Sequence, residues 1–300
     1  MKRLVLVVIL ALTMAQSAFA QNACFKGQKP EKPIYAACDS RLLKYDEAGN
    51  LVWKYDKDVA PLMGDLQLLP NGNLLFADGA KAQEITQDGK VVFTFIPEDN
   101  GRNDLVFSAE RLDDGNTLVC WNTANKMVLV DPNGKIVKEI QCQFASPKND
   151  DHHNLRIVRK TPRGTYWAAH KHSGTVAEYA EDCTFMRKFV LEGKDAYAVQ
   201  ELPSGEIMAT YLDCIVIFDK DCKEVWRWTN EDMAKLGVEN SYLCNIFPRK
   251  NGNFVISNFA CNTGDKHLVC MFEFTRDKQV VWYYQNPEAP TSFMGVVVEE

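Results

Sequence analysis

Hydrophobic and polar residues alternate over short stretches of this chain, and glycine turns interrupt the alternation at regular intervals. Each short apolar stretch ends at a turn and is followed by a second alternating stretch. The turn glycines are Gly72, Gly115, Gly164, Gly205 and Gly252, which are 43, 49, 41 and 47 residues apart. Repeats of about 40 to 50 residues with four short strands each are typical of propeller blades.

A second turn recurs within the repeats, before a strand that often contains tryptophan. Its copies include residues 46–53, 131–138, 219–226 and 277–282. Asp and Gly suit a hairpin turn because they tolerate a positive φ, and a tryptophan ring can fill the space between twisted sheets. The pattern predicts an all-β protein, a six-bladed propeller of four-stranded antiparallel blades.

The two ends of the repeat region are incomplete in complementary ways. Three strands within residues 34–55 have no inner strand before them, and residues 293–298 form an inner strand with no strands after it. We expect the C-terminal strand to pair with the N-terminal strands, because this closes the ring and leaves no long free edge. A short helix is expected at 230–237, with Asn230 as its N-cap and Gly237 at its end.

The first residues of the chain do not share the repeat pattern. Two basic residues precede an apolar run from Leu4 to Met14, and a small-residue cleavage site ends at Ala20, which is typical of a signal peptide. The expected organisation is a signal peptide at residues 1–20, an N-terminal extension at 21–33 and a single propeller domain at 34–300. We expect a periplasmic or secreted protein with no membrane span, since no other stretch reaches the roughly 18 apolar residues that spanning requires.

The charge balance narrows the range of partners. The formal net charge is −6, and without the two basic residues near the N-terminus 32 basic and 40 acidic residues remain. No basic run occurs, so nucleic acid and anionic lipid are not expected as partners. A small-molecule or protein ligand bound by a monomer is the expectation, and no specific cofactor is predicted.

Ten cysteines in an exported chain make disulfides an option. Cys214 and Cys261 each follow a turn glycine by nine residues, and Cys244 lies on the inner strand between them. One disulfide within this trio and reduced, buried thiols remain two open alternatives. Cys120 and Cys270 lie within apolar strands and are expected to be small core residues.

Four of the five histidines belong to the fourth repeat. His152 and His153 stand where its inner strand begins, and His170 and His172 lie between its second and third strands, which places all four on one face of a propeller. If the strand persists through Lys171, both later imidazoles point to the same side, a geometry that metal sites use. A catalytic or ligand-binding cluster, a metal site and ordinary exposed side chains are all open interpretations.

Two rings of residues emerge when the inner strands are aligned on the apolar residue before each turn. The first position is mostly aromatic, with Phe107, Tyr197, Tyr242 and Phe293. These rings either surround the channel mouth, where they suit a planar or sugar-like ligand, or pack between blades. The fourth position is mostly polar, with Gln67, Glu110, Arg156, Gln200 and Asn245. It predicts either a hydrated channel or a site in which Arg156 holds an anion and Glu110 partly neutralises it.

Two stretches carry a family resemblance. The repeated Asp-to-Trp phrase at residues 46–53 and 219–226 resembles the repeats of quinoprotein-like propellers. Residues 150–154, followed by residues 161–172 and a tyrosine-containing strand, are similar to the His-Xaa-Asn blade of arylsulfotransferase-type propellers. That resemblance implies sulfuryl transfer from an aryl sulfate to a phenol through His152, with Asn154 as its companion.

The sequence thus leads to one main hypothesis and two alternatives. The main hypothesis is an exported ligand- or protein-binding propeller that uses the channel-mouth face of its fourth blade. The expected binding residues are Asn154, Arg156, His170, Lys171, His172, Glu110, Phe107, Tyr197 and Tyr242. The first alternative is sulfuryl transfer with His152 and His153 as catalytic residues, and Arg156 or Lys171 stabilising the sulfate oxygens. The second is a metal-dependent enzyme that acts on sugars or lactones at the same mouth.

Overall fold

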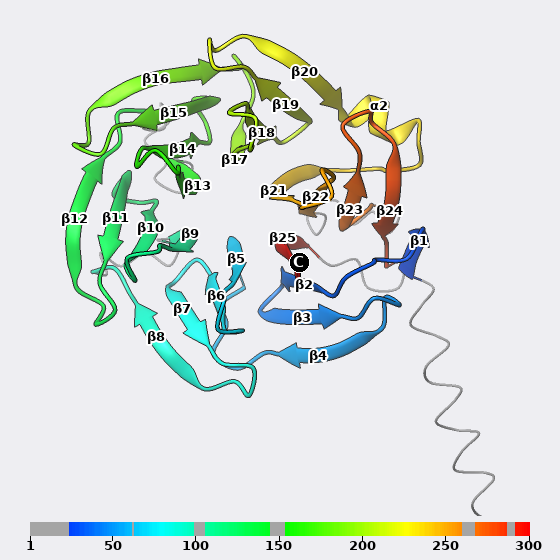
Figure 1. Cartoon of the computed structure of the whole chain (residues 1–300), viewed down its shortest axis with the longest axis horizontal. Coiled ribbons are helices and arrows are strands. Elements are labelled where there is room, and N and C mark those ends of the chain that lie inside the picture. The colour runs from blue at the N-terminus through cyan, green and yellow to red at the C-terminus, as the bar shows by residue number, and fades with distance from the viewer. Residues whose placement is uncertain (1–23, 62, 99–105, 145–153, 260–267, 287–291) are drawn as a thin grey trace, which may run out of the picture.

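Six antiparallel sheets form the blades of a ring around a central channel (Figure 1). The computed structural model describes residues 24–61, 63–98, 106–144, 154–259, 268–286 and 292–300. Within these residues, five of the sheets have four strands and the sixth has five. The predicted six-bladed propeller is confirmed.

The blades follow one another along the chain, and within each blade the strands run from the channel to the rim. Blade one contains β25 (Phe293–Val298), β2 (Ile34–Cys38), β3 (Arg41–Tyr45) and β4 (Leu51–Tyr55). Blade two contains β5 (Asp65–Leu68), β6 (Leu74–Ala77), β7 (Ala82–Ile85) and β8 (Val91–Phe95). Blade three contains β9 (Val106–Arg111), β10 (Thr117–Trp121), β11 (Lys126–Val130) and β12 (Ile136–Gln141).

The second half of the ring repeats this order. Blade four contains β13 (Leu155–Lys160), β14 (Tyr166–His170), β15 (Thr175–Tyr179) and β16 (Phe185–Val190). Blade five contains β17 (Ala196–Glu201), β18 (Ile207–Tyr211), β19 (Cys214–Phe218) and β20 (Glu224–Thr229). Blade six contains β21 (Tyr242–Pro248), β22 (Phe254–Phe259), β23 (Met271–Phe274), β24 (Val280–Tyr284) and β1 (Phe25–Gly27).

The ring closes through blade one, as the sequence predicts. The last strand, β25, pairs with β2 from Ile34 opposite Val298 to Cys38 opposite Phe293. Every residue of β25 is buried. The C-terminal strand therefore supplies the inner strand that the N-terminal three lack.

The N-terminal extension also contributes a strand, which the sequence analysis did not expect. Strand β1 pairs with β24 and covers the outer edge of blade six (Figure 1). The ring of Phe25 packs at centroid distances of 5.5 Å from Tyr45, 5.5 Å from Trp282 and 5.1 Å from Tyr284. Since Tyr45 belongs to blade one, this aromatic cluster joins the first and last blades.

The short helix after blade five is α2 (Asn230–Ala234), and its cap differs from the prediction by one residue. The hydroxyl of Thr229, not the side chain of Asn230, caps the helix by accepting a hydrogen bond from the amide of Asp232 at 3.2 Å. Gly237 follows the helix with a φ of +81°. The helix therefore ends three residues earlier than predicted, and Gly237 lies in the turn that follows it. The N-cap moves because a threonine precedes the predicted asparagine.

Tryptophans on the outer strands link neighbouring blades, as predicted. The indole of Trp53 in blade one donates to the carbonyl of Gln87 in blade two at 3.1 Å. Trp226 in blade five likewise donates to the carbonyl of Arg276 in blade six at 2.9 Å. Each ring thus fills space between two blades and satisfies its one polar group there.

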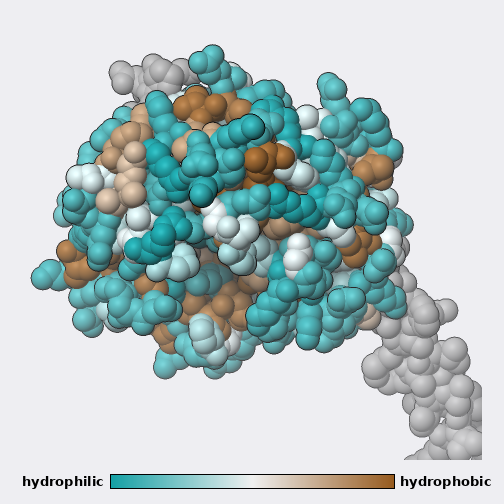
Figure 2. Space-filling view, turned by 45° about the horizontal axis from the view of Figure 1, so that its top comes forward, coloured by the Kyte–Doolittle hydropathy of each residue, from teal (hydrophilic) through white to brown (hydrophobic). Residues whose placement is uncertain are grey.

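The surface carries small apolar patches separated by polar residues (Figure 2). The second residue of each outer strand in blades one to five is an exposed apolar side chain: Val52, Val92, Val137, Met186 and Val225. Within the described residues, no helix is long and apolar enough to cross a membrane.

The glycine turns of the structure fix which residues of the inner strands lie at the same level, and this differs from the sequence alignment in two blades. The residue whose amide closes each glycine turn is Leu69, Leu112, Thr161, Leu202 or Arg249. In blades four and six the apolar residues on which the sequence alignment rests are Val158 and Phe247. They lie three and two residues before Thr161 and Arg249, so the alignment of these two blades is wrong. Thr161 replaces an apolar anchor because its hydroxyl lies 2.8 Å from that of Thr165. Arg249 replaces one because it pairs with Glu273 at 2.7 Å.

Candidate functional site

The corrected register places Arg159, not Arg156, at the same level of the channel as Gln67, Glu110 and Gln200. Arg159 faces Trp167 in its ladder just as Glu110 faces Leu118 and Gln200 faces Met208. The expected pairing of Arg156 with Glu110 is therefore wrong. The fourth-position ring is polar in blades two to five, and Phe247 and Val297 occupy it in blades six and one.

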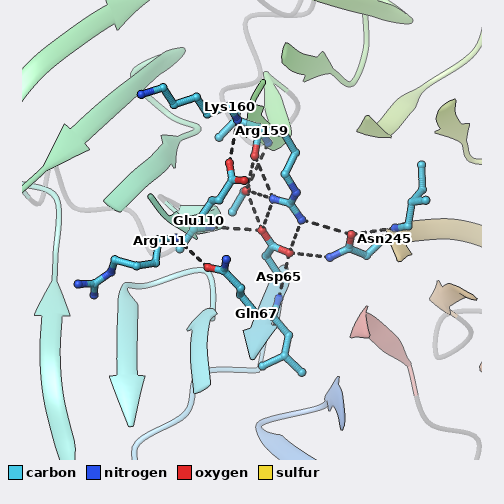
Figure 3. Close-up of polar contacts among 12 residues, drawn as sticks. Asp65, Gln67, Glu110, Arg111, Arg159, Lys160 and Asn245 are labelled. Carbon is cyan, nitrogen blue, oxygen red and sulfur yellow. Dashed lines mark hydrogen bonds and ion pairs between the residues drawn. The ribbon is translucent and has the colours of Figure 1, made fainter. Parts of the chain in front are cut away.

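A central ionic network crosses the channel and joins Asp65, Arg159 and Asn245 (Figure 3). Ser108 also belongs to it. The Arg159 guanidinium binds both carboxylate oxygens of Asp65, at 2.7 and 2.8 Å. The carboxylate also accepts a bond from the Ser108 hydroxyl at 2.8 Å and one from the Asn245 amide at 2.6 Å. These residues come from blades three, four and six around an aspartate from blade two, so the network ties four blades together.

The carboxylate and the amide of the network are almost completely shielded from solvent, whereas 14% of the Arg159 side chain is exposed. Asp65 is 1% exposed and Asn245 is 2% exposed. Burial alone would lower the pKa of Arg159, but the charge of Asp65 raises it above its ordinary value. The buried ion pair is therefore internally satisfied, which is the condition under which such a pair is tolerated.

A chamber of about 350 Å³ lies along the channel beside this network. Its polar wall includes Gln67, Glu110, Arg159 and Gln200, and its apolar wall includes Phe247 and Val296. Pro203 and Pro248, next to the turns of blades five and six, complete its lining on the face that carries the glycine turns. A concave site with an apolar lining and a few converging polar groups is the usual form of a small-molecule pocket.

Glu110 is an acidic group of the chamber wall whose pKa is strongly shifted. Burial raises its pKa to about 7, against the opposing attraction of Arg159. One carboxylate oxygen accepts a hydrogen bond from the amide of Lys160 at 2.8 Å. At neutral pH the carboxyl is therefore close to half protonated, and it can serve as a donor or as an acceptor.

The opposite end of the channel, where the inner strands begin, is built from Phe107, Arg156 and Tyr197. The Arg156 guanidinium lies 4.1 Å from the ring centroid of Phe107 and 5.9 Å from that of Tyr197. Exposure is 1% for Phe107, 2% for Arg156 and 4% for Tyr197. Here the aromatic residues pack with the arginine inside the molecule, which favours the packing alternative over an exposed rim.

Tyr242 does not join this group. It begins β21 and is 38% exposed, and the residue of blade six at the level of Phe107 and Tyr197 is Cys244. The aromatic ring predicted at the first position is therefore interrupted in blade six.

The two described histidines of blade four point to different partners. His170 is fully buried at the end of β14, and its Nε2 lies 3.2 Å from the hydroxyl of Tyr179. His172 lies beyond the strand end, with its Nδ1 3.1 Å from Asp195. The strand does not persist through Lys171, so the paired imidazole geometry expected for a metal does not form. Among the described residues, no group of three or more potential ligands could hold a metal ion.

The remaining predicted residues near blade four have structural contacts. The Asn154 side chain donates to the carbonyl of Asn122 at 3.3 Å and joins blades three and four. The ammonium of Lys171 lies 4.0 Å from a carboxylate oxygen of Asp195. His152 and His153 lie outside the described residues, so their catalytic role stays a prediction.

The structure describes two of the three cysteines for which a disulfide or reduced thiols were the alternatives. Cys214 and Cys244, the two described members of the trio, are free thiols. Cys261 lies outside the described residues. Cys120 and Cys270 are fully buried, as expected of core residues.

Sequence reasoning missed Asp65 and Arg159, the two charged residues at the centre of the channel. The available signal was a charged residue within an otherwise apolar inner strand, which must find a partner when it is buried. Arg159 was overlooked because the alignment of blade four rested on Val158. Anchoring that blade on the Thr161 turn places Arg159 in the polar ring.

Comparisons with known proteins support the fold. No protein-family model and no curated protein matches the chain. A structure of a protein of unknown function from Bacteroides caccae is 20% identical, with a TM-score of 0.76 over 90% of this chain and 99% of that chain. A streptogramin B lyase structure is 8% identical, with a TM-score of 0.61 over 87% of each chain.

A further similar structure contains a ligand. It is a catalytically inactive virginiamycin B lyase from Staphylococcus aureus with quinupristin, 10% identical, with a TM-score of 0.60 over 87% of this chain and 88% of that chain. At these identities the likeness shows the propeller fold alone.

Proposed function

We propose that this chain is a binding protein that holds a small polar ligand in the channel chamber beside Glu110 and Arg159. The observation that carries the proposal is the chamber itself, in which a carboxyl group and an amide-rich wall face apolar residues. Its volume is within the usual range of small-molecule sites, near the lower limit of roughly 300 Å³.

This proposal moves the ligand from the blade-four mouth to the chamber. Phe107, Arg156 and Tyr197 are buried at the mouth end, whereas Glu110 and Gln200 are partly exposed and line a cavity. Lys171 and His172 retain some exposure and leave the blade-four face as a second candidate surface for a protein ligand.

The test is a fragment screen by ligand-observed NMR, followed by affinity measurement for each hit. Gln200→Phe places a ring in the chamber and is expected to weaken chamber ligands at least tenfold. Val137→Phe, on the exposed face of β12, is the matched control and should leave affinities unchanged. Hits that bind both variants equally, or no saturable hit at all, would contradict the proposal.

Sulfuryl transfer remains a second candidate only through the resemblance around His152. Neither described histidine of blade four is an accessible nucleophile, since His170 is buried and His172 pairs with Asp195. Turnover of an aryl sulfate with a phenol acceptor, abolished by His152→Ala, would favour this enzyme over a binding protein.

We propose export together with binding. The support is the basic start, the apolar run from Leu4 to Met14 and the cleavage motif at Ala20. Residues 1–23 lie outside the described residues. Intact mass of the protein recovered from the periplasm or medium should correspond to a chain that begins at Gln21, and a full-length mass there would contradict cleavage.

A further inference from the structure

The charged groups of the chamber differ in how far their partners satisfy them. Arg159 is held by both oxygens of Asp65. Glu201, which also lines the chamber, is paired with the guanidinium of Arg163 through both of its oxygens. Glu110 has no described cation within ion-pair distance, and its hydrogen bond comes from a backbone amide.

The cations next to Glu110 in sequence or across the blade are engaged elsewhere. The Arg111 guanidinium binds Glu84 at 2.8 Å and lies 4.9 Å from the ring centroid of Phe93. The Lys160 ammonium lies 5.9 Å from the ring centroid of Tyr166. The chamber therefore contains one carboxyl group that can still accept a cationic partner.

We propose that the ligand of this chamber is a small organic cation whose ammonium group pairs with the carboxylate of Glu110. The proposal rests on the function proposed above, because it assigns a ligand class to the same chamber. Phe247, Pro203, Pro248 and Val296 would contact the apolar part of such a ligand. An anionic ligand is disfavoured for two reasons. The charge of Arg159 is already neutralised by Asp65, and the carboxylate of Glu110 would repel a second negative charge.

Proton exchange should accompany binding. The groups that face Glu110 are Arg159 and Lys160 from β13 and Asp65 from β5. Burial and the charge of Asp65 raise the pKa of Glu110, and together they outweigh the two cations, which lower it. A cation beside the carboxylate favours the ionised form, so binding near neutral pH releases a proton. Affinity should therefore rise with pH, by about tenfold between pH 6 and pH 8 for a group that titrates near 7.

Three probes of matched shape and different charge test the inference. We would measure binding of benzylammonium, benzyl alcohol and benzoate to the mature chain by calorimetry, in two buffers of different ionisation enthalpy. Benzylammonium should bind at least tenfold more tightly than the alcohol at pH 8, and benzoate should bind least. Near pH 7, the difference in binding enthalpy between the two buffers should reveal proton release.

Glu110→Gln is the informative variant, because Gln67 and Gln200 occupy the same position in blades two and five and glutamine therefore suits this register. It should abolish the preference for benzylammonium and its pH dependence. The matched control Glu139→Gln alters a carboxylate on β12 that pairs with Lys126 and should change neither. NMR signals of the aromatic side chains that match those of the wild type would confirm that both variants fold.

The outcomes separate the inference from the proposed function. If benzyl alcohol or benzoate bound as tightly as benzylammonium, and Gln200→Phe weakened that binding, the preference for a cation would be overturned. The chamber would still be a binding site. A preference for benzylammonium that persists in Glu110→Gln would also overturn the inference. Failure of all three probes, when the fragment screen yields chamber ligands, would overturn the cation alone; failure of the screen as well would overturn both.

Discussion

His170 shows at the scale of one residue what burial does to an ionisable side chain. It is fully enclosed, and its ring meets that of Phe144 edge-on at a centroid distance of 5.4 Å. The Tyr179 hydroxyl accepts a hydrogen bond from the amide of Gln143, which leaves its proton for Nε2 of His170. The histidine is therefore a neutral core residue that joins β14 to β15.

This environment predicts a loss of stability in acid. Burial lowers the pKa of His170 to about 3, whereas the unfolded chain takes up a proton near 6.5. Its neutral form therefore stabilises the fold fully above pH 6.5, and this contribution declines as the pH falls toward 3. Between pH 7 and pH 5 the loss should be about 2 kcal/mol.

The comparison is between wild type and His170→Gln, which keeps polar atoms but cannot take up a proton. Urea unfolding at pH 7 and pH 5 should show a smaller drop in unfolding free energy for the variant. Equal drops in both proteins would mean that His170 does not contribute to acid sensitivity.

Gly64, directly before β5, occupies in blade two the level at which Phe107 and Tyr197 stand in blades three and five. A Cβ atom at this residue would lie 2.2 Å from the carbonyl oxygen of Phe107 in the next blade. Residue 64 is a glycine because the backbones of blades two and three approach too closely for a side chain. This close approach also brings β5 near β9, where Asp65 reaches Ser108.

Among elements, strands β5 and β9 should separate if Gly64 gains a side chain. Gly64→Ala should destabilise the protein by about 2 kcal/mol or more, because backbone atoms must move. Gly72→Ala is the matched control: its Cβ would meet nothing within 4 Å, and only its φ of +83° costs free energy, about 1 kcal/mol. Thermal unfolding of both variants measures the difference, and an equal loss in the two would contradict the steric explanation.

The turns between third and fourth strands show that glycine is not the only solution to a positive φ. Gly49, Gly89 and Gly134 fill this position in blades one to three, with φ near +82°. Cys183, Cys222 and Lys278 fill it in blades four to six, with φ between 64° and 74°. These three blades therefore keep the same turn geometry without glycine, and a non-glycine residue tolerates the strain of the positive φ.

At the scale of the whole molecule, closure depends on eight C-terminal residues. Removing residues 293–300 would delete β25 and expose β2 and the neighbouring inner strand β5. The five buried apolar side chains of β25, at about 1.5 to 3 kcal/mol each, amount to a sizeable part of the stability of a typical domain. The truncated chain should therefore lose cooperative unfolding.

The control is removal of residues 299–300 alone. It deletes the ion pairs of Glu299 with Lys44 and of Glu300 with Arg249, and should lower the melting temperature by only a few degrees. Differential scanning calorimetry compares the two truncations. If removal of residues 293–300 left the thermal unfolding transition unchanged, closure through β25 would be contradicted.

The repeat pattern determined the architecture from sequence alone, because alternation and turn chemistry are local properties. Blade number, antiparallel order and joining of the two termini follow from counting turns and unpaired strands. The start of the helix at Asn230–Ala234 was located within one residue for the same reason, whereas its end was predicted three residues too late.

The channel was decided by tertiary structure. Whether Arg156 or Arg159 faces Glu110 depends on where blade four closes its turn, and a hydrogen-bonded Thr161 carries no hydrophobic signal. Asp65 and Asn245 meet only because the ring closes, since they are 180 residues apart in sequence. Contacts across a closed ring depend on every blade between the partners, so no local pattern records them, and the burial that shifts Glu110 exists only once those blades have packed.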